Sequence, residues 1–314
     1  TVNDKATIAE GIAIVRGTNE AVVFSVGLND TVSTLLSGTD HTNELSEILT
    51  DDSDIGIKVQ DAVTLTQGDV VANATTGTVQ YITGVNDTVL SMYTGGSIQP
   101  KLTNITTHDS DIPVEISGLL SHDYVEHLNA ISAVTTGPVT ASISGDSSEL
   151  QYLITLDTDT VAITVNDVTN ATTGNLVTTK SGTGVTFSGG ITDTIGNLAP
   201  SGVATQDLTN ITTDDTDVTI IVTDETNANE GEIVANATTG DVTFRIGIND
   251  TINNLQSGVS ITDNLSTIVT ANSSTRVNIT DGDIGGTNIT KLNTVVTGVA
   301  GVVTGNMSGS KMQM

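Results

Sequence analysis

The chain has 314 residues and carries 37 acidic against 9 basic side chains, a formal charge of −28 that makes nucleic acid a poor candidate partner. It contains no cysteine, which excludes disulfides, thiolate metal sites and cysteine nucleophiles. No run approaches the ~18 apolar residues that a membrane helix needs, so we expect no membrane insertion.

Two kinds of strand-like segment alternate along the chain, each with the apolar–polar alternation that is typical of strands. The first kind begins with "AVVFSVGLNDTVSTL" at Ala21 and returns as "TVQYITGVNDTVLSM" at Thr78, "GVTFSGGITDTIGNL" at Gly184 and "DVTFRIGINDTINNL" at Asp241. The second kind occupies 56–61, 113–118, 161–167, 218–224 and 276–281. A shorter copy of the first kind, "PVTASISGDSSEL", lies at 138–150 with Ala141 in place of the aromatic residue.

The four long copies keep one register in several columns of residues. The aromatic residues stand 57, 106 and 57 positions apart, at Phe24, Tyr81, Phe187 and Phe244. An acidic column follows six residues later, at Asp30, Asp87, Asp193 and Asp250. A leucine column contains Leu45, Leu102, Leu208 and Leu265, and an isoleucine column contains Ile48, Ile105, Ile211 and Ile268. Because all three phenylalanines fall in the aromatic column, we predict that this column is buried as an internal ladder.

Segments of about 15 to 25 residues connect the strand-like runs, and their Leu-x-x-Ile spacing predicts one or two helical turns. In "NDTINNLQSG" the side chain of Asp250 or Thr251 can cap backbone N–H groups, and Gly258 can end the turn. One strand with a short return per ~22 to 33 residues is typical of a solenoid. We therefore predict a β-rich, α/β-like solenoid of stacked parallel strands with about twelve coils, elongated to ~55 to 60 Å.

The repeats predict one continuous array over 1–314 rather than separate domains. Its approximate units are 1–55, 56–112, 113–159, 160–218, 219–275 and 276–314, of which the third is short and the last incomplete. The first residues resemble an ordinary strand, and the sequence stops inside a recognisable copy. A repeat array needs capping units, so we expect this one to continue in a longer protein or to pack its ends on other subunits.

Pairs of aspartates precede the second kind of strand in several copies. They are Asp52 and Asp54, Asp109 and Asp111, Asp157 and Asp159, and Asp215 and Asp217. Calcium takes six to eight oxygen ligands, and D-x-D turns supply such oxygens, so these pairs are candidate Ca²⁺ ligands. The alternative is that the aspartates bond to the backbone and form turns before each strand. No glycine-rich calcium nonapeptide or EF-hand loop is present, and we expect no other cofactor.

Catalytic motifs are absent from the sequence. It has no G-x-S-x-G elbow, no P-loop, no dinucleotide fingerprint and no H-E-x-x-H zinc motif. An active site in a repeat protein should be a local break in the repeat. The short unit 113–159 is such a break and contains His122, Asp123, Tyr124 and His127, next to Glu126.

Three of the repeated motifs resemble repeats in known groups of proteins. The "VxVxD" strands, "xxNDTxxxLxSG" and "LNAIxxxTTG" resemble degenerate repeats of very long surface or secreted proteins of cyanobacteria and other bacteria. They are similar, too, to virion structural proteins of marine cyanobacterial phages. The resemblance covers nearly the whole chain through a motif of low complexity. It implies an extended structural or adhesive role and brings no catalytic residues.

Three functions follow from these observations as hypotheses. The first is a non-enzymatic structural repeat protein in the shaft of an extracellular fibre, filament or virion appendage, with copies of itself or other structural subunits as partners. The second is a Ca²⁺-stiffened surface adhesin that binds a cell-surface glycan or receptor. The third is a carbohydrate-cleaving β-helix of the tailspike type, which would need paired carboxylates in a cleft. Each of them places the chain outside the cell, on the cell surface or on a virion.

Overall fold

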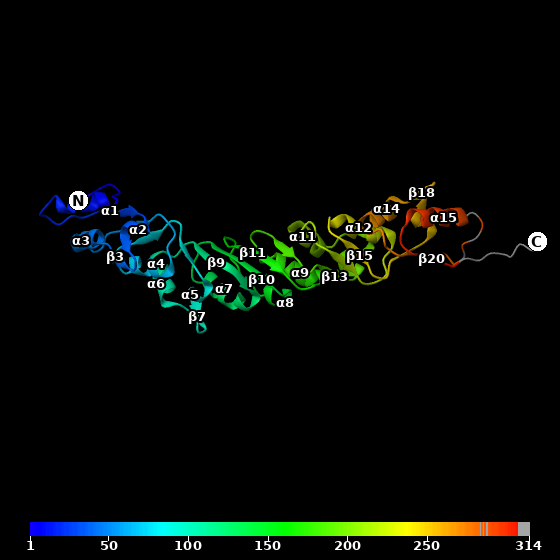
Figure 1. Ribbon diagram of the computed structural model, residues 1–314, viewed down its shortest axis with the longest axis horizontal. Coiled ribbons are helices and arrows are strands. Elements are labelled where there is room, and N and C mark those ends of the chain that lie inside the picture. Colours follow the sequence, from blue (N-terminus) through cyan, green and yellow to red (C-terminus); the bar gives the residue numbers. More distant parts are fainter. Residues whose placement is uncertain (283, 285, 287, 307–314) are drawn as a thin grey trace, which may run out of the picture. The chain divides into compact units, whose positions relative to one another are not determined.

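The computed structural model describes residues 1–282, 284, 286 and 288–306 (Figure 1). The chain divides into two compact units. The first contains Thr1–Ser144, Tyr152–Ala162 and Lys180–Thr183. The second contains Gly145–Gln151, Ile163–Thr179 and Gly184–Met314, whose last eight residues, like part of the incomplete repeat predicted at 276–314, lie outside the described residues.

Helices and short strands alternate along the whole described chain. Up to Gly145 they are α1 (Ile8–Arg16), β1 (Leu28–Asp30), α2 (Val32–Leu35), β2 (Leu36–Ser37), β3 (Asp40–His41), α3 (Asn43–Asp51), β4 (Ile57–Val59), α4 (Leu65–Ala72), β5 (Val79–Tyr81), β6 (Val85–Asp87), α5 (Val89–Met92), β7 (Tyr93–Thr94), β8 (Ser97–Ile98), α6 (Pro100–His108), β9 (Val114–Ser121), the 3-10 helix η1 (His122–Tyr124), α7 (Val125–Ser132) and β10 (Val139–Gly145).

The remaining elements continue this alternation. They are α8 (Ser147–Leu150), β11 (Thr160–Val165), α9 (Ala171–Thr178), β12 (Val185–Phe187), β13 (Ile191–Asp193), α10 (Ile195–Leu198), the 3-10 helix η2 (Pro200–Gly202), α11 (Gln206–Asp214), β14 (Ile220–Val222), α12 (Ala228–Ala237), β15 (Val242–Phe244), β16 (Ile248–Asp250), α13 (Ile252–Leu255), β17 (Gln256–Ser257), β18 (Ser260–Ile261), α14 (Asp263–Ala271), β19 (Val277–Ile279), α15 (Asn288–Gly298) and β20 (Val303–Gly305).

The longer-range strand pairs are parallel and belong to small sheets. In the first unit, β4 lies between β1 and β5, with Ile57 opposite both Leu28 and Val79, and β9 lies between β6 and β10. In the second unit, β14 lies between β13 and β15, β19 lies between β16 and β20, and β11 pairs with β12. Three antiparallel hairpins, β2–β3, β7–β8 and β17–β18, follow the short helices α2, α5 and α13.

The prediction of a β-rich solenoid of stacked parallel strands is wrong. The protein is a mixed α/β structure with 38% helix and 24% strand, and its sheets contain two to five strands. One reason is that the aromatic run is broken into two three-residue strands in three copies, and into an isolated bridge at Phe24 and the strand β1 in the first. A glycine with positive φ stands at the break, as Gly84 does at 91° between β5 and β6. The other reason is that the connecting segments form helices of up to eleven residues rather than brief returns.

The helices of successive segments pack in pairs, α1 with α3, α4 with α6, α9 with α11 and α12 with α14 (Figure 1). The isoleucine column of the second helix contacts a glycine in the first. A Cβ on Gly68 would lie 2.7 Å from Ile105 Cδ1, which is closer than real Cβ atoms approach. The same contact recurs at Gly11 with Ile48, Gly174 with Ile211 and Gly231 with Ile268. These helical glycines therefore allow the two helices to approach closely, although glycine is a poor helix former.

The aromatic column is buried, as the sequence predicts. Phe24, Tyr81, Phe187 and Phe244 are only 2% to 5% exposed. The Tyr81 hydroxyl donates to the Gly68 carbonyl at 2.6 Å, so its polar end is satisfied. Among the described residues, the ring contacts involve Tyr93, Tyr124 and His127, so no two of the four column rings stack on one another.

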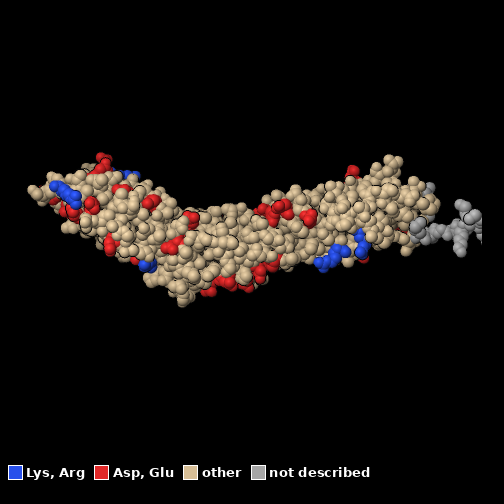
Figure 2. Space-filling view, viewed as in Figure 1, with Lys and Arg blue, Asp and Glu red and all other residues tan. Residues whose placement is uncertain are grey.

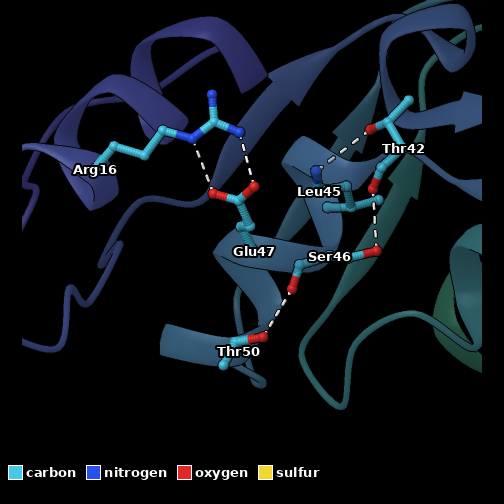
Figure 3. A network of polar contacts seen from close by, with 6 residues as sticks. All are labelled: Arg16, Thr42, Leu45, Ser46, Glu47 and Thr50. Atoms are coloured by element: carbon cyan, nitrogen blue, oxygen red, sulfur yellow. Dashed lines mark hydrogen bonds and ion pairs between the residues drawn. The ribbon is translucent and has the colours of Figure 1, made fainter.

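Threonine and asparagine side chains start most of the longer helices. Thr7, Thr64 and Asn227 form capping boxes with the glutamate or glutamine three residues later. Figure 3 shows a simpler cap in α3, where Thr42 Oγ1 accepts from Leu45 N at 3.3 Å. An ion pair joins α3 to α1, because the Arg16 guanidinium donates twice to Glu47 (Figure 3). Both side chains are exposed, so this pair contributes little to stability.

Acidic side chains are scattered over the face seen in Figure 2, with few basic ones between them. Among the described residues, no helix combines the length and the apolar character that crossing a membrane requires.

Candidate functional site

The aspartate pairs that the sequence singles out share one arrangement in three copies. The first member, Asp52, Asp109 or Asp215, is buried. The second member, two residues later, is exposed. The two carboxyl groups of each pair interact with one another. The structure therefore brings together the two members of a pair.

The buried member of each pair bonds to the aromatic residue 28 positions earlier. Asp52 Oδ2 accepts from Phe24 N at 2.6 Å, and Asp109 Oδ2 accepts from Tyr81 N at 2.7 Å. Asp215 Oδ2 accepts from Phe187 N at 2.6 Å. In the second copy the reason is visible in the sheets: β5 is an edge strand, because the next strand, β9, pairs with β6 instead. Asp109 thus supplies the acceptor that a neighbouring strand would otherwise provide.

The fourth copy fills the same positions with neutral side chains. Asn272 stands where the other copies have the buried aspartate, and Ser274 stands at the second position. Asn272 Nδ2 donates to the Val242 carbonyl at 3.0 Å, and Ser274 Oγ donates to Asn272 Oδ1 at 2.7 Å. The side chain at this position therefore bonds to the backbone of β15 without carrying a charge.

Asp157 and Asp159 differ from the other pairs. Asp159 is buried and accepts from Val139 N at 2.9 Å, Leu156 N at 2.9 Å and Ser132 Oγ at 2.5 Å. Asp157 is exposed. Asp159 therefore also ties backbone N–H groups together, and its neighbour lies apart from that network.

The bonds of the buried aspartates to the backbone leave fewer carboxylate oxygens for the predicted calcium sites. No group of three or more His, Asp or Glu side chains that could hold a metal ion occurs within the described ranges. Calcium requires six to eight oxygens, and one oxygen of each buried aspartate is already bonded to a backbone N–H. Calcium binding by these pairs thus stays a prediction without a coordination geometry.

Burial shifts the titration of the paired aspartates. It raises the pKa of Asp109 to about 6, against the lowering effect of the Tyr81 N–H, and the Asp111 carboxyl beside it raises the pKa further. The pKa values of Asp52 and Asp215 are also raised, again mainly by burial and further by Asp54 and Asp217. Two like charges in a partly desolvated site oppose each other, so ionisation of these pairs costs stability.

We expect Asp111→Asn to stabilise the protein at pH 8 by about 1 to 2 kcal/mol, after allowance for solvent screening. The folded-state pKa of Asp109 lies above the unfolded value, so the wild-type protein loses stability as pH rises from about 4 to about 6. Without the Asp111 charge this loss should be smaller. The loss of unfolding free energy between pH 5 and pH 8 is measured by urea unfolding at both pH values. About 0.5 M NaCl screens the net charge.

Asp4→Asn is the matched control for this prediction, because it removes the same charge from an exposed position. It should leave the pH dependence of unfolding unchanged. The prediction is wrong when Asp111→Asn and wild type lose the same stability between the two pH values.

The acidic column has a capping role that reaches across segments. Asp250 Oδ1 accepts from the N–H of Thr251, the N-cap residue, at 2.7 Å, but neither Asp250 nor Thr251 caps a helical N–H of α13, so the predicted local cap is wrong. Asp250 Oδ2 accepts from Ala228 N at 3.0 Å, at the start of the preceding long helix α12. The same double contact is made by Asp30, Asp87 and Asp193. Gly258, by contrast, lies in the β17–β18 turn with φ 61° and does not end α13.

A further set of aspartates was missed by the sequence reasoning. Asp61 Oδ1 accepts from Val32 N at 2.7 Å, at the start of the short helix α2. The same relation holds for Asp167 with Ser147, Asp224 with Ile195 and Asp281 with Ile252. In the sequence these residues are marked only as the last residue of a VxVxD run. Their bonding partners lie 20 to 29 residues earlier and are not indicated by the local pattern.

The short unit 113–159 does assemble an aromatic and titratable cluster. The His127 ring lies 4.4 Å from Tyr93 and 5.1 Å from Tyr124, centroid to centroid. Tyr93 OH donates to Glu126 Oε1 at 3.2 Å, and burial raises the pKa of Tyr93. His127 Nδ1 is buried and has no hydrogen-bond partner among the described residues. Asp123, in the 3-10 helix η1, is exposed and lies with Oδ1 3.8 Å from His122 Nε2.

Comparisons of the chain with protein-family models, with curated proteins and with solved structures find no match. The function must therefore be argued from the residues themselves.

Proposed function

We propose that the chain is a non-enzymatic structural repeat protein, part of an extracellular fibre, filament or virion appendage. The observation that supports this most is the use of the repeated aspartates. In the acidic column, each carboxylate bonds to backbone N–H groups of its own segment and of the preceding helix. Chemistry that recurs in every copy and is directed at the backbone serves architecture rather than turnover.

The composition supports the same function. Hydroxyl and amide side chains cap helices, and Ile, Leu and Val fill the interior, so the repeated segment needs few aromatic residues. The degenerate repeats resemble those of long bacterial surface proteins and of marine cyanophage virion proteins, which gives the proposal its extracellular setting. The partners are then copies of this chain or other structural subunits.

Immunogold electron microscopy tests this proposal. Antibodies raised against the purified chain should label fibres, filaments or particle appendages of the source, at more than one position along each. Pre-immune serum is the control. Label confined to the cell interior would contradict the proposal.

Activity measurements add a second test. The purified chain should hydrolyse no polysaccharide, because Glu126 is engaged by Tyr93 and the aspartate pairs are engaged by the backbone. Turnover that is lost in Glu126→Gln or Asp123→Asn would move the carbohydrate-cleaving function to first place.

A further inference from the structure

The repeat is broken at one place in the second unit, next to α10. The other three long copies carry an antiparallel hairpin there, but this copy carries the 3-10 turn η2. Ser201 occupies the hairpin-turn position that is glycine elsewhere, at Gly38, Gly95 and Gly258. It has φ 57°, and it is the one residue other than glycine with positive φ in the described part of the chain. A left-handed conformation is strained for a serine, because its Cβ crowds the backbone.

Ser201 stands on the rim of a hollow of about 510 Å³. The walls come from the N-terminal ends of α12, α13 and α14, and five of the nine lining residues are asparagines: Asn227, Asn229, Asn253, Asn254 and Asn264. The corresponding positions of the other copies hold Thr, Ala, Ser, Gly, Leu, Lys or acidic residues for the most part, so this concentration of amides occurs in one copy.

Asn229 and Asn264 stand at two positions whose side chains are bonded to each other in other copies. That bond crosses the groove that forms the hollow here. Lys101 Nζ donates to Thr66 Oγ1 at 2.9 Å in the second copy. In the third copy, Thr172 Oγ1 donates to Asp207 Oδ2 at 3.3 Å. The equivalent residues here are Asn229 and Asn264. Neither of their side chains makes a hydrogen bond within the described structure, although Asn229 Nδ2 lies against Gly202 of η2, so both amides keep hydrogen-bonding capacity for a ligand.

The remaining wall groups are held in place. Asn227 Oδ1 caps α12 by accepting from Glu230 N at 2.9 Å, and Asn254 Nδ2 donates to Asp250 Oδ1 at 2.6 Å. Asp250 is buried and its Oδ2 accepts from Ala228 N. At the edge, Lys291 Nζ donates to Asn253 Oδ1 at 2.6 Å, which engages that ammonium group. The hollow is therefore preorganised on one side and polar, and no basic residue lines it.

We infer that this hollow is a binding site for a neutral saccharide. An amide offers both donors and an acceptor, which matches a sugar hydroxyl that both donates and accepts. The volume lies within the usual range for small-ligand sites, and the carboxylate of Asp250 disfavours an anionic sugar. No aromatic residue lines the hollow to stack on a sugar face, so a single site should bind weakly, with a Kd of about 1 to 10 mM. The site does not depend on the structural role proposed above.

Side-chain amide NMR spectra of the ¹⁵N-labelled whole chain test the site directly. Lactose, maltose and N-acetylglucosamine are the neutral probes, and glucuronate is the anionic one. At least one neutral probe should shift the Asn229 and Asn264 side-chain signals saturably below about 50 mM, and glucuronate should bind more weakly. Absence of any saturable shift with all three neutral probes, or tighter binding of glucuronate, overturns the inference.

The paired variant Asn229→Thr, Asn264→Lys copies the bridge of the second copy, where Asp69 stands at the position of Glu232, so it should fold and close the groove. It should weaken binding at least about tenfold. Asn236→Thr, an exposed asparagine of α12 outside the hollow, is the control and should bind as the wild type does. Equal affinity in the paired variant and the wild type would place the sugar elsewhere and overturn the inference.

Discussion

Phe244→Ala is expected to lower the free energy of unfolding of the second unit by about 3 to 5 kcal/mol. The Phe244 side chain is 5% exposed and stands in β15, opposite Val222 of β14. Truncation removes most of its buried apolar surface and leaves a cavity that the short strands around it cannot fill. Urea unfolding of the whole chain measures the loss.

The loss should also be local. Because the repeated contacts join neighbouring segments, amides of β13, β14 and β15 should exchange faster in the Phe244→Ala variant. Amides of the first-unit sheet β1–β4–β5 should keep their protection. Thr243→Ala, at the exposed neighbouring position, is the control and should change stability by no more than about 0.5 kcal/mol. Equal loss of protection in both units would contradict the prediction.

Burial could be predicted from the sequence because it depends on columns that keep their spacing. The aromatic residues and the Leu and Ile columns are all buried, for example Phe187, Leu208 and Ile211. The helices were underestimated for a physical reason. A helix such as α3 buries only Leu45 and Ile48. Leu49 adds a third apolar residue at helical spacing, but three apolar residues in nine do not show from the sequence how far the helix extends.

The close contacts between helices were also hidden. Gly174 and Gly231 stand inside helices, where glycine ordinarily signals a break, and their role is set by Ile211 and Ile268 of the next helix. A contact between residues 37 positions apart cannot be read from local pattern.

The candidate site was predicted in position but not in role. The register of Asp52, Asp109 and Asp215 marked them as one feature of the repeat, and two interpretations stood open, calcium ligation and turn formation. The carboxylates do bond to the backbone, and Asp52 and Asp215 also interact with the backbone two residues later, but the stronger partner is the N–H of an aromatic residue 28 positions earlier. This partner depends on which strand stands at the edge of a sheet, as β5 and β12 do, and that is a property of the tertiary structure.

The acidic column accounts for part of the charge of −28. Asp193 accepts from Ala171 N at 2.9 Å, Thr194 N at 2.8 Å and Asn197 Nδ2 at 2.7 Å. Ala171 is fully buried at the start of α9, so its N–H has no ready replacement in water. Asp193→Ala should therefore cost about 2 to 4 kcal/mol, since it leaves buried donors unsatisfied. Asp193→Asn keeps one acceptor oxygen and should cost roughly half as much.

Asp241→Ala is the matched control. Asp241 is exposed, and its substitution removes the same charge from the same unit. If the acidic residues mattered only through net charge, both alanine variants would relieve repulsion and both would become more stable in low salt. Capping predicts the opposite for Asp193 alone, at every salt concentration, with the loss appearing first in the hydrogen exchange of α9. An Asp193→Ala variant as stable as Asp241→Ala would show that this carboxylate is not needed to hold the segments together, and the architectural interpretation of the repeated aspartates would fail with it.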